Sequence, residues 1–340
     1  MGPGTGGADR APALPQLGHA NVTATATTYQ FGGAGVAITL TFRSSGMRAG
    51  NLTSSSRPIT YITWSVRSLD AGGGGTKPGN SGGGHRVQLY FDAGAEHCTS
   101  SNRENVSWGR AAPPAPPATA ALAAAASVHA ASPSPPSASA SGAFEAMRIG
   151  ASVQKVLHVA PDISKHINWG YMYVAWRSSS AANATSVLSG AAATRRGFCA
   201  TGALPTRDDT RMPRPVDDDG IVAAVVFDCG TVGTTELGAE TQPGGTGAGA
   251  GSCERSVVFA YDDVKSVEYD HRQLEPYWRH RYRERYPAPP PGAGVSPKDD
   301  PTFIGMLGEA VQDEAAETEL ARARQFRHHF GPFLTGCSTL

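Results

Sequence analysis

This sequence of 340 residues lacks several features by which common classes of protein are recognised. Its 29 lysines and arginines balance 29 aspartates and glutamates, and the basic residues form no stripe. Because a phosphate backbone is bound by clustered positive charge, nucleic-acid binding is not expected. The chain contains no run of about 18 apolar residues, so no membrane span is expected. Its first residues also lack the apolar core of a secretory signal peptide.

The cysteines form no recognisable pattern. They occur at wide and irregular spacing without a CxxC pair, which argues against a zinc site, and no cofactor is predicted. Their odd number leaves at least one thiol unpaired within a monomer. Scattered thiols, buried or partly exposed, are favoured over a disulfide framework. The five residues are Cys98, Cys199, Cys229, Cys253 and Cys337.

Familiar catalytic motifs are missing as well. The chain has no GxSxG, no HExxH and no cysteine flanked like a nucleophile. The glycine-rich turn Gly32–Gly35 opens a predicted strand rather than a helix and is not followed by Gly-Lys-Ser/Thr. It is therefore not interpreted as a phosphate loop. The catalytic residues, if the chain has any, stay unknown at this point.

Glycine and proline are abundant, with 41 and 25 residues, and much of this excess lies in low-complexity stretches. Such stretches carry too few large apolar side chains to form a packed core. We therefore predict a disordered N-terminus and several disordered Gly/Pro/Ala-rich inserts. The N-terminus is 1–20, the inserts are 71–84, 111–142 and 231–252, and a proline-rich linker follows at 286–300.

The remaining sequence shows the alternation of apolar and polar residues that is typical of β-strands. In Arg57–Asp70, the apolar residues Ile62, Trp64 and Val66 alternate with polar neighbours. His85–Asp92 alternates in the same way, so the two segments predict a long hairpin with one buried and one wet face.

Other segments extend this pattern. Gly35–Arg43 alternates cleanly, and the continuous apolar run Ile221–Phe227 predicts a strand that is buried on both faces. Arg195–Pro215 is interpreted as a long polar connection. The sequence thus predicts a mainly β protein, an antiparallel β-sandwich over residues 21–285, with one or two C-terminal helices.

Helical spacing replaces the alternation near the C-terminus. The apolar residues of 301–340 recur every three or four positions until Gly331 and Pro332 end the pattern. We expect this stripe to lack a partner within the chain, and therefore to promote self-association through the C-terminal helix. The stripe consists of Phe303, Met306, Leu307, Ala310 and Val311, continued by Leu320, Ala323, Phe326 and Phe330.

Acidic residues form the only constellations with catalytic potential. Paired carboxylates can act in general acid/base hydrolysis or bind calcium. The pairs Asp208-Asp209 and Asp262-Asp263 and the triplet Asp217–Asp219 each lie near a predicted strand end. A solvated or structural role is favoured for the triplet and, less strongly, for Asp262-Asp263. Adjacent strand residues face opposite ways, so Asp262 and Asp263 cannot flank one substrate atom without a bulge.

Three other groups have a functional and a plain interpretation. The adjacent pair His328-His329 diverges on a helix and cannot chelate one metal, so ordinary histidines are favoured. The basic run Arg279–Arg285 is interpreted as a solvated edge rather than an anion site. Six aromatic residues could stack on a sugar or peptide, although core packing is favoured. They are Trp169, Tyr171, Tyr173, Trp176, Tyr277 and Trp278.

Four Asn-x-Ser/Thr sequons suggest passage through a secretory pathway, although a chain rich in Ser and Thr acquires some by chance. An extracellular, secreted glycoprotein is therefore one hypothesis, and the location stays open. The possible N-glycosylation sites are Asn21, Asn51, Asn105 and Asn183.

Several segments, taken in order, resemble the N-terminal domain of the glutaminase A family, and the similarity covers residues 24 to 330 with gaps. The resemblance implies a β-sandwich followed by a helical α/α-toroid domain that hydrolyses the amide of glutamine. The segments are Arg57–Asp70 with Val87–Glu96, then Asn168–Ala175, Arg255–Asp263 and Pro276–Arg279.

The resemblance further implies that residues 301–340 are a stub at the start of the helical catalytic domain, which is expected to be the partner of the sandwich in full-length relatives. On this interpretation the family's catalytic residues have no counterparts here. The alternative is a stand-alone β-sandwich module that binds glycan or peptide.

Overall fold

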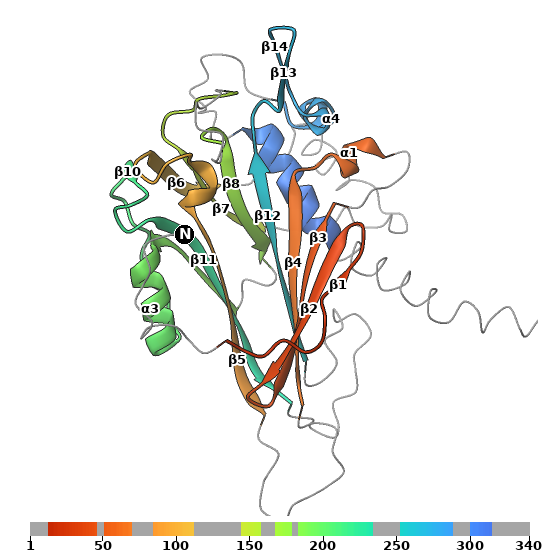
Figure 1. Ribbon diagram of the computed structural model, residues 1–340, viewed down its shortest axis with the longest axis vertical. Coiled ribbons are helices and arrows are strands. Elements are labelled where there is room, and N and C mark those ends of the chain that lie inside the picture. The colour runs from red at the N-terminus through yellow and green to blue at the C-terminus, as the bar shows by residue number, and fades with distance from the viewer. Residues whose placement is uncertain are drawn as a thin grey trace, which may run out of the picture.

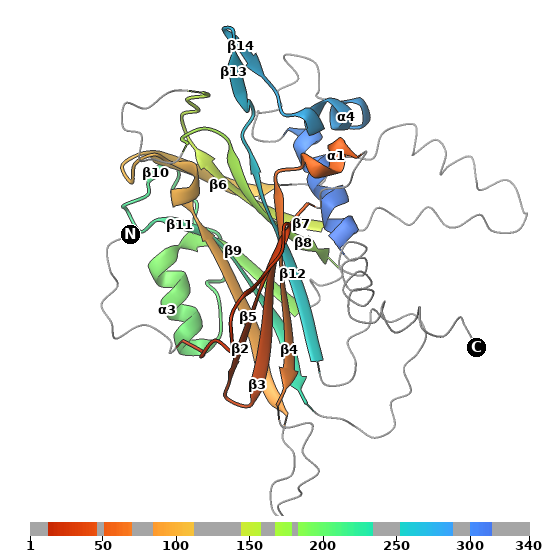
Figure 2. The ribbon, with the colours of Figure 1, turned by 45° about the vertical axis from the view of Figure 1, so that its right-hand side comes forward.

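The computed structural model describes residues 13–45, 51–69, 84–111, 144–157, 167–178, 183–233, 252–287 and 300–314. Two antiparallel sheets face each other, and helices cover the outer face of each sheet (Figures 1 and 2). The predicted mainly β, antiparallel sandwich is therefore confirmed. No helix among these residues has the length and apolar character needed to cross a membrane.

The larger sheet has nine strands in the order β1-β2-β3-β4-β12-β8-β7-β6-β10, all paired antiparallel. Their bounds are β1 (Asn21–Val22), β2 (Ala26–Gly33), β3 (Val36–Ser44), β4 (Ile59–Ser68), β6 (Asn105–Ala111), β7 (Phe144–Ala151), β8 (Tyr171–Arg177), β10 (Arg214–Pro215) and β12 (Ser252–Asp262).

The smaller sheet has three strands in the order β5-β11-β9, namely β5 (His85–Gly94), β11 (Ile221–Val232) and β9 (Ala184–Gly190). A separate two-stranded ribbon, β13 (Val267–Tyr269) and β14 (Arg272–Leu274), projects from the end of the sandwich (Figure 1). The helices are α1 (Leu52–Ser55), the 3-10 turn η2 (Ala95–Cys98), α3 (Ala191–Thr201) and α4 (Tyr277–Arg285). Residues 301–314 are helical as well.

The main core fills the space between the two sheets, as the alternation predicts. Ile62 and Val66 of β4 face inward and meet Leu89 of β5 and Phe227 of β11. Burying each such side chain stabilises the fold by about 1.5–3 kcal/mol. The interpretation of Ile221–Phe227 as a fully buried strand is confirmed, because α3 and its neighbours cover the outer face of the small sheet.

Two predictions about connectivity are wrong. The expected hairpin does not form, because β4 pairs with β3 and β12 whereas β5 pairs with β11 in the other sheet. Alternation identifies a strand but not its partner, and a long spacer lets the chain cross from sheet to sheet. The predicted polar connection Arg195–Pro215 begins inside α3.

The low-complexity predictions fall largely on residues outside the described ranges, including 70–83, 112–143, 234–251 and 288–299. The N-terminal prediction needs a correction at 13–20. There, Leu17 donates its backbone N–H to Gln30 and the carbonyl of Pro15 accepts from Gly32, so this segment borders β2. Backbone groups at the edge of β2 are thereby paired.

The outer face of the large sheet is also buried, which corrects the expected wet face. Tyr61 and Tyr173 project from that face onto α4 and the helical residues 301–311. The Tyr173 ring stacks on Phe303 at 4.6 Å between centroids, and Tyr61 Oη donates to the Ala310 carbonyl at 3.3 Å.

The expectation of an exposed C-terminal stripe is therefore wrong for the described part of it. Phe303, Met306, Leu307, Ala310 and Val311 are each at most 1% exposed. These residues cover the chain's own sheet and so offer no surface for self-association. The rest of the predicted stripe, Leu320, Ala323, Phe326 and Phe330, lies outside the described residues.

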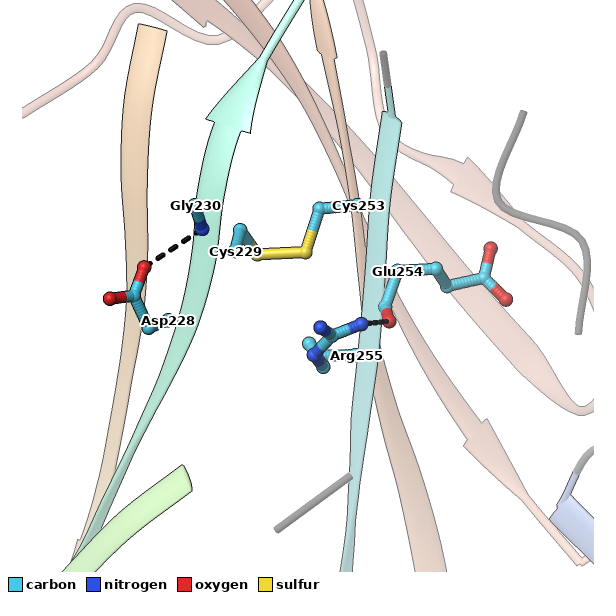
Figure 3. Close-up of a disulfide and its surroundings, with 6 residues drawn as sticks. All are labelled: Asp228, Cys229, Gly230, Cys253, Glu254 and Arg255. Carbon is cyan, nitrogen blue, oxygen red and sulfur yellow. Dashed lines mark hydrogen bonds between the residues drawn. A yellow bond between two sulfur atoms is a disulfide. The ribbon is translucent and has the colours of Figure 1, made fainter. Parts of the chain in front are cut away.

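The preference for unpaired thiols is corrected by one disulfide. Cys229 of β11 and Cys253 of β12 are bonded, which links the two sheets covalently across the core (Figure 3). Cys98 is a buried free thiol and Cys199 an exposed one, whereas Cys337 lies outside the described residues.

Opening this disulfide should lower stability. The bond closes a sequence separation of 24 residues, so Cys229→Ala should reduce the free energy of unfolding by about 3 kcal/mol by freeing the unfolded chain. Urea unfolding followed by fluorescence measures the change. The control is Cys199→Ala, which should leave the midpoint unchanged; equal midpoints for both variants would contradict the structural role.

Truncating Phe303, which packs the helical residues 301–314 onto the larger sheet, should also destabilise the fold. Phe303→Ala removes a fully buried ring and should cost about 3–5 kcal/mol through lost burial and a cavity. Tyr277→Ala is the matched control, since this helical aromatic residue is exposed and should change stability by less than about 0.5 kcal/mol. A Phe303→Ala chain that melts at the wild-type temperature would show that the helix does not stabilise the sandwich.

Candidate functional site

A polar groove of 570 Å³ lies where α1, α4 and the helical residues 301–314 meet. α1 and α4 are side by side in both views of the ribbon (Figures 1 and 2). The groove lies within the size range of small-molecule sites, about 300–1,000 Å³. Its lining is Asn51, Thr53, Ser54, Arg57, Arg281, Tyr282, Glu284, Arg285 and Glu309.

Charged groups of both signs line this groove in pairs. Arg285 bonds to Glu309, and Arg281 Nη1 lies 3.3 Å from Glu284 Oε2. The side chains of Arg281, Arg285 and Glu284 are more than half exposed, so these pairs add little stability and can exchange partners. Guanidinium and carboxylate groups in such a setting can bind hydroxyl, amide or carboxylate groups of a ligand.

Arg57 forms the floor of the groove. Its side chain is only 8% exposed, its Nη1 lies 2.7 Å from Asp313 Oδ2, and its guanidinium lies over the Tyr282 ring. Its Nη2 lies 3.9 Å from Glu309 Oε2, beyond hydrogen-bonding distance, and its Nε is buried without a hydrogen-bond partner. A buried guanidinium of this kind is fixed in position and contributes charge at the base of the site.

Asn51 positions the α1 side of the groove. It is the N-cap of α1, and its Oδ1 accepts the backbone N–H of Ser54 at 3.1 Å. Asparagine is favoured at this position because its side chain satisfies an otherwise unpaired helix N–H. Thr53 and Ser54, which follow the cap in α1, line the groove together with residues of α4.

Next to this groove, a buried joint of Arg279, Asp262 and Asp300 holds α4 and the C-terminal helix, residues 301–314, on the larger sheet. Arg279 of α4 bonds to Asp262 at the end of β12 and to Asp300, which precedes the helical segment. Asp300 also caps that segment, since its Oδ1 accepts the N–H of Thr302 at 2.9 Å. Asp262 and Arg279 are almost fully buried, so each needs the other.

The candidate pair Asp262-Asp263 thus has separate structural roles. Asp262 accepts from Arg279 and from the Val264 N–H, whereas Asp263 accepts from the Ser266 hydroxyl at 2.6 Å. The two side chains do not converge on one atom, as expected for adjacent strand residues. Burial raises the pKa of Asp262 to about 6, a rise that the positive charge of Arg279 limits.

Asp208 and Asp209 also have partners within the fold. Asp208 pairs with Arg110 at 2.9 Å and accepts the N–H of Leu188. Asp209 lies between Arg211 and Arg214, and the hydrogen bond from Arg211 holds the pKa of Asp209 well below its usual range.

Within the triplet, Asp219 accepts the N–H of Ala192 at 3.0 Å and so caps the first turn of α3. The carboxylates of Asp208, Asp209 and Asp219 therefore bind chain elements to one another. Among the residues that the structure describes, no group of three or more His, Cys, Asp or Glu could hold a metal ion.

The six aromatic residues considered for stacking on a ligand do not share one surface. Tyr171, Tyr173, Trp176 and Trp278 are core residues, Trp169 is half-buried and Tyr277 is exposed. The favoured interpretation as core packing is confirmed for the four buried residues. The pair His328-His329 lies outside the described residues.

The basic run Arg279–Arg285 separates into two roles along α4. Arg279 points into the buried joint, whereas Arg281 and Arg285 line the groove. The interpretation as a merely solvated edge is therefore too simple. Arg57 and Asp313, which pair across 256 positions of sequence, gave no local signal.

A family model described as a domain of unknown function, DUF5127, matches residues 25–130 and 123–288. The matched span begins just before β2 and ends just after α4, so it includes almost all of both sheets. No curated protein matches the chain.

The buried joint should make stability depend on pH. The pKa of Asp262 is raised to about 6 in the fold, against about 3.9 when unfolded. The folded state binds this proton more tightly, so the stability that Asp262 contributes is full below the unfolded pKa and is lost as the pH rises through the folded pKa. We expect Asp262→Asn to remove this decrease, about 3 kcal/mol between pH values of about 4 and 7.

Urea unfolding of wild type and Asp262→Asn over this pH range measures the effect as a difference between the two curves. Asp208→Asn is the control, since Asp208 pairs with Arg110 of β6 and not with a residue of the buried joint. Parallel curves for wild type and Asp262→Asn would rule out a raised pKa at this position.

Proposed function

Since this chain belongs to the family described as a domain of unknown function, DUF5127, we propose that it is the N-terminal accessory β-sandwich of a glutaminase-A-like hydrolase. In this proposal the amide hydrolysis of glutamine takes place on a separate helical domain, which is the partner of the sandwich. The chain itself then positions or stabilises that partner. Support comes from the order of the segments that resemble the glutaminase A family.

The observation that carries the proposal is the state of the acidic pairs. A carboxylate that acts as a general base must be free to approach the proton it removes. Asp208, Asp209 and Asp262 are each bonded to arginine, and Asp219 caps a helix. These contacts favour a structural role for the acidic residues over a catalytic one.

A second candidate is a stand-alone module that binds glycan or peptide. The polar groove between α1 and α4 favours it, because paired guanidinium and carboxylate groups match the hydroxyl and amide groups of such ligands. The two candidates differ in what the sandwich recognises, either a covalently linked or adjoining helical domain or a free ligand.

A secreted glycoprotein is part of the same proposal. The disulfide between the sheets is of the kind that persists in oxidising compartments. All four sequon asparagines, Asn21, Asn51, Asn105 and Asn183, are exposed, as the attachment of a glycan requires.

The accessory role predicts that the purified chain releases no ammonia from L-glutamine above the buffer rate. It has the same consequence for the chromogenic γ-glutamyl anilide, because the side chains of Asp208, Asp209, Asp219, Asp262 and Asp263 already have structural partners. A coupled ammonia assay and absorbance at the anilide band measure the two rates. Turnover that disappears in Asp262→Ala or Asp263→Ala, with the fold intact by circular dichroism, would overturn the proposal and assign catalysis to this chain.

A further inference from the structure

One of the four sequons opens directly onto the polar groove. Asn51, Leu52 and Thr53 form the sequon, and both Asn51 and Thr53 line the groove. The other sequon asparagines lie elsewhere, Asn21 in β1, Asn105 in β6 and Asn183 just before β9. A glycan on Asn51 would therefore begin at the rim of a charged depression, whereas the other three would begin on exposed strand ends or loops.

We propose that the N-glycan on Asn51 lies in this groove, with its first sugar residues bonded to Arg281 and Arg285 of α4. Attachment forms a bond between sugar C1 and Asn51 Nδ2, with loss of one amide proton and release of the lipid pyrophosphate that carried the sugar. The helix cap uses Oδ1 of Asn51, so the modification leaves the cap intact. This inference rests on the secretory passage proposed above and not on the accessory role.

The chemistry of the lining fits N-acetylglucosamine, the sugar attached to asparagine. The exposed guanidinium groups of Arg281 and Arg285 donate hydrogen bonds to ring hydroxyls and to the acetamide carbonyl. Glu284 and Glu309 accept from hydroxyl groups and from the acetamide N–H. Each arginine of the lining already has a carboxylate beside it, so this mixed charge suits a neutral polyol better than an anion.

Covalent attachment favours a glycan tethered to Asn51 over a free sugar as the ligand of the groove. A short tether gives a bound group an effective concentration on the order of millimolar, so that weak contacts suffice to hold it. A free sugar would need a stacking platform or more enclosure, and Tyr282, the aromatic residue in the lining, is buried with its ring against Arg57. The docked glycan would link α1 to α4 and thereby support the helical layer.

The experiment uses the full chain secreted from a eukaryotic host. Glycans are released from the native protein by an endoglycosidase, and the rate at each site is followed by glycopeptide mass spectrometry. We expect release at Asn51 to be at least about tenfold slower than at Asn105 and Asn183, the ratio expected for about 1.4 kcal/mol of docking. The double variant Arg281→Ala/Arg285→Ala should raise the rate at Asn51 alone to that of the other sites.

A matched pair of sequon variants separates the glycan from the helix cap. Thr53→Ala abolishes the sequon but keeps the Asn51 cap, whereas Thr53→Ser keeps both. Amide exchange in α4 should accelerate in Thr53→Ala and stay at the wild-type rate in Thr53→Ser.

An unmodified Asn51, or equal release rates at all sites, would overturn the proposal. So would protection of α4 in the Thr53→Ala chain by free N,N′-diacetylchitobiose well below about 1 mM. That last result would assign the groove to a separate carbohydrate ligand.

Discussion

One buried arginine holds the helical layer on the larger sheet. Arg279 bonds at once to Asp262, at the end of a central strand, and to Asp300, which begins the C-terminal helical segment. A buried charge without a partner is strongly destabilising, so the three residues fix one another's positions. With the joint in place, the helix lies along the sheet and α4 lies against α1 (Figure 2). The groove exists only because of that arrangement.

Burial of the large sheet on both faces explains the pattern of apolar and polar residues in its middle strands. β8 is apolar almost throughout, since alternate residues enter the core between the sheets and the layer beneath the helices. The first residues of β4 are also covered on the outer face, where Tyr61 packs under the helical residues 301–311. The later residues on that face of β4 are polar. Alternation of apolar and polar residues therefore marks the part of a strand that no helix covers, whereas a continuous apolar run marks the part that is buried on both faces.

The sequence predicted local structure well and distant pairing poorly, for a physical reason. Alternation in Gly35–Arg43 and helical spacing from Phe303 to Val311 are short-range signals, and both segments have the predicted structure. The partners of β4 and β5 depend instead on how the chain closes a long loop, whose entropic cost changes little with length. The pairing of Cys229 with Cys253 is fixed by the same closure, because it follows from β11 and β12 facing each other.

For the candidate site, too, the sequence showed the local features but not the contacts between distant segments. Acidic clusters were visible in the sequence, yet a carboxylate near a strand end is as useful for binding an arginine or capping a helix as for chemistry. Asp262 and Asp219 illustrate these two uses. The groove residues are contributed by α1, α4 and the 301–314 segment, and no spacing rule connects them. What could be read locally was the sequon at Asn51, and its meaning depends on which surface the fold brings next to it. The docking of the C-terminal helix thus determines both the stability of the outer layer and the surroundings of that asparagine.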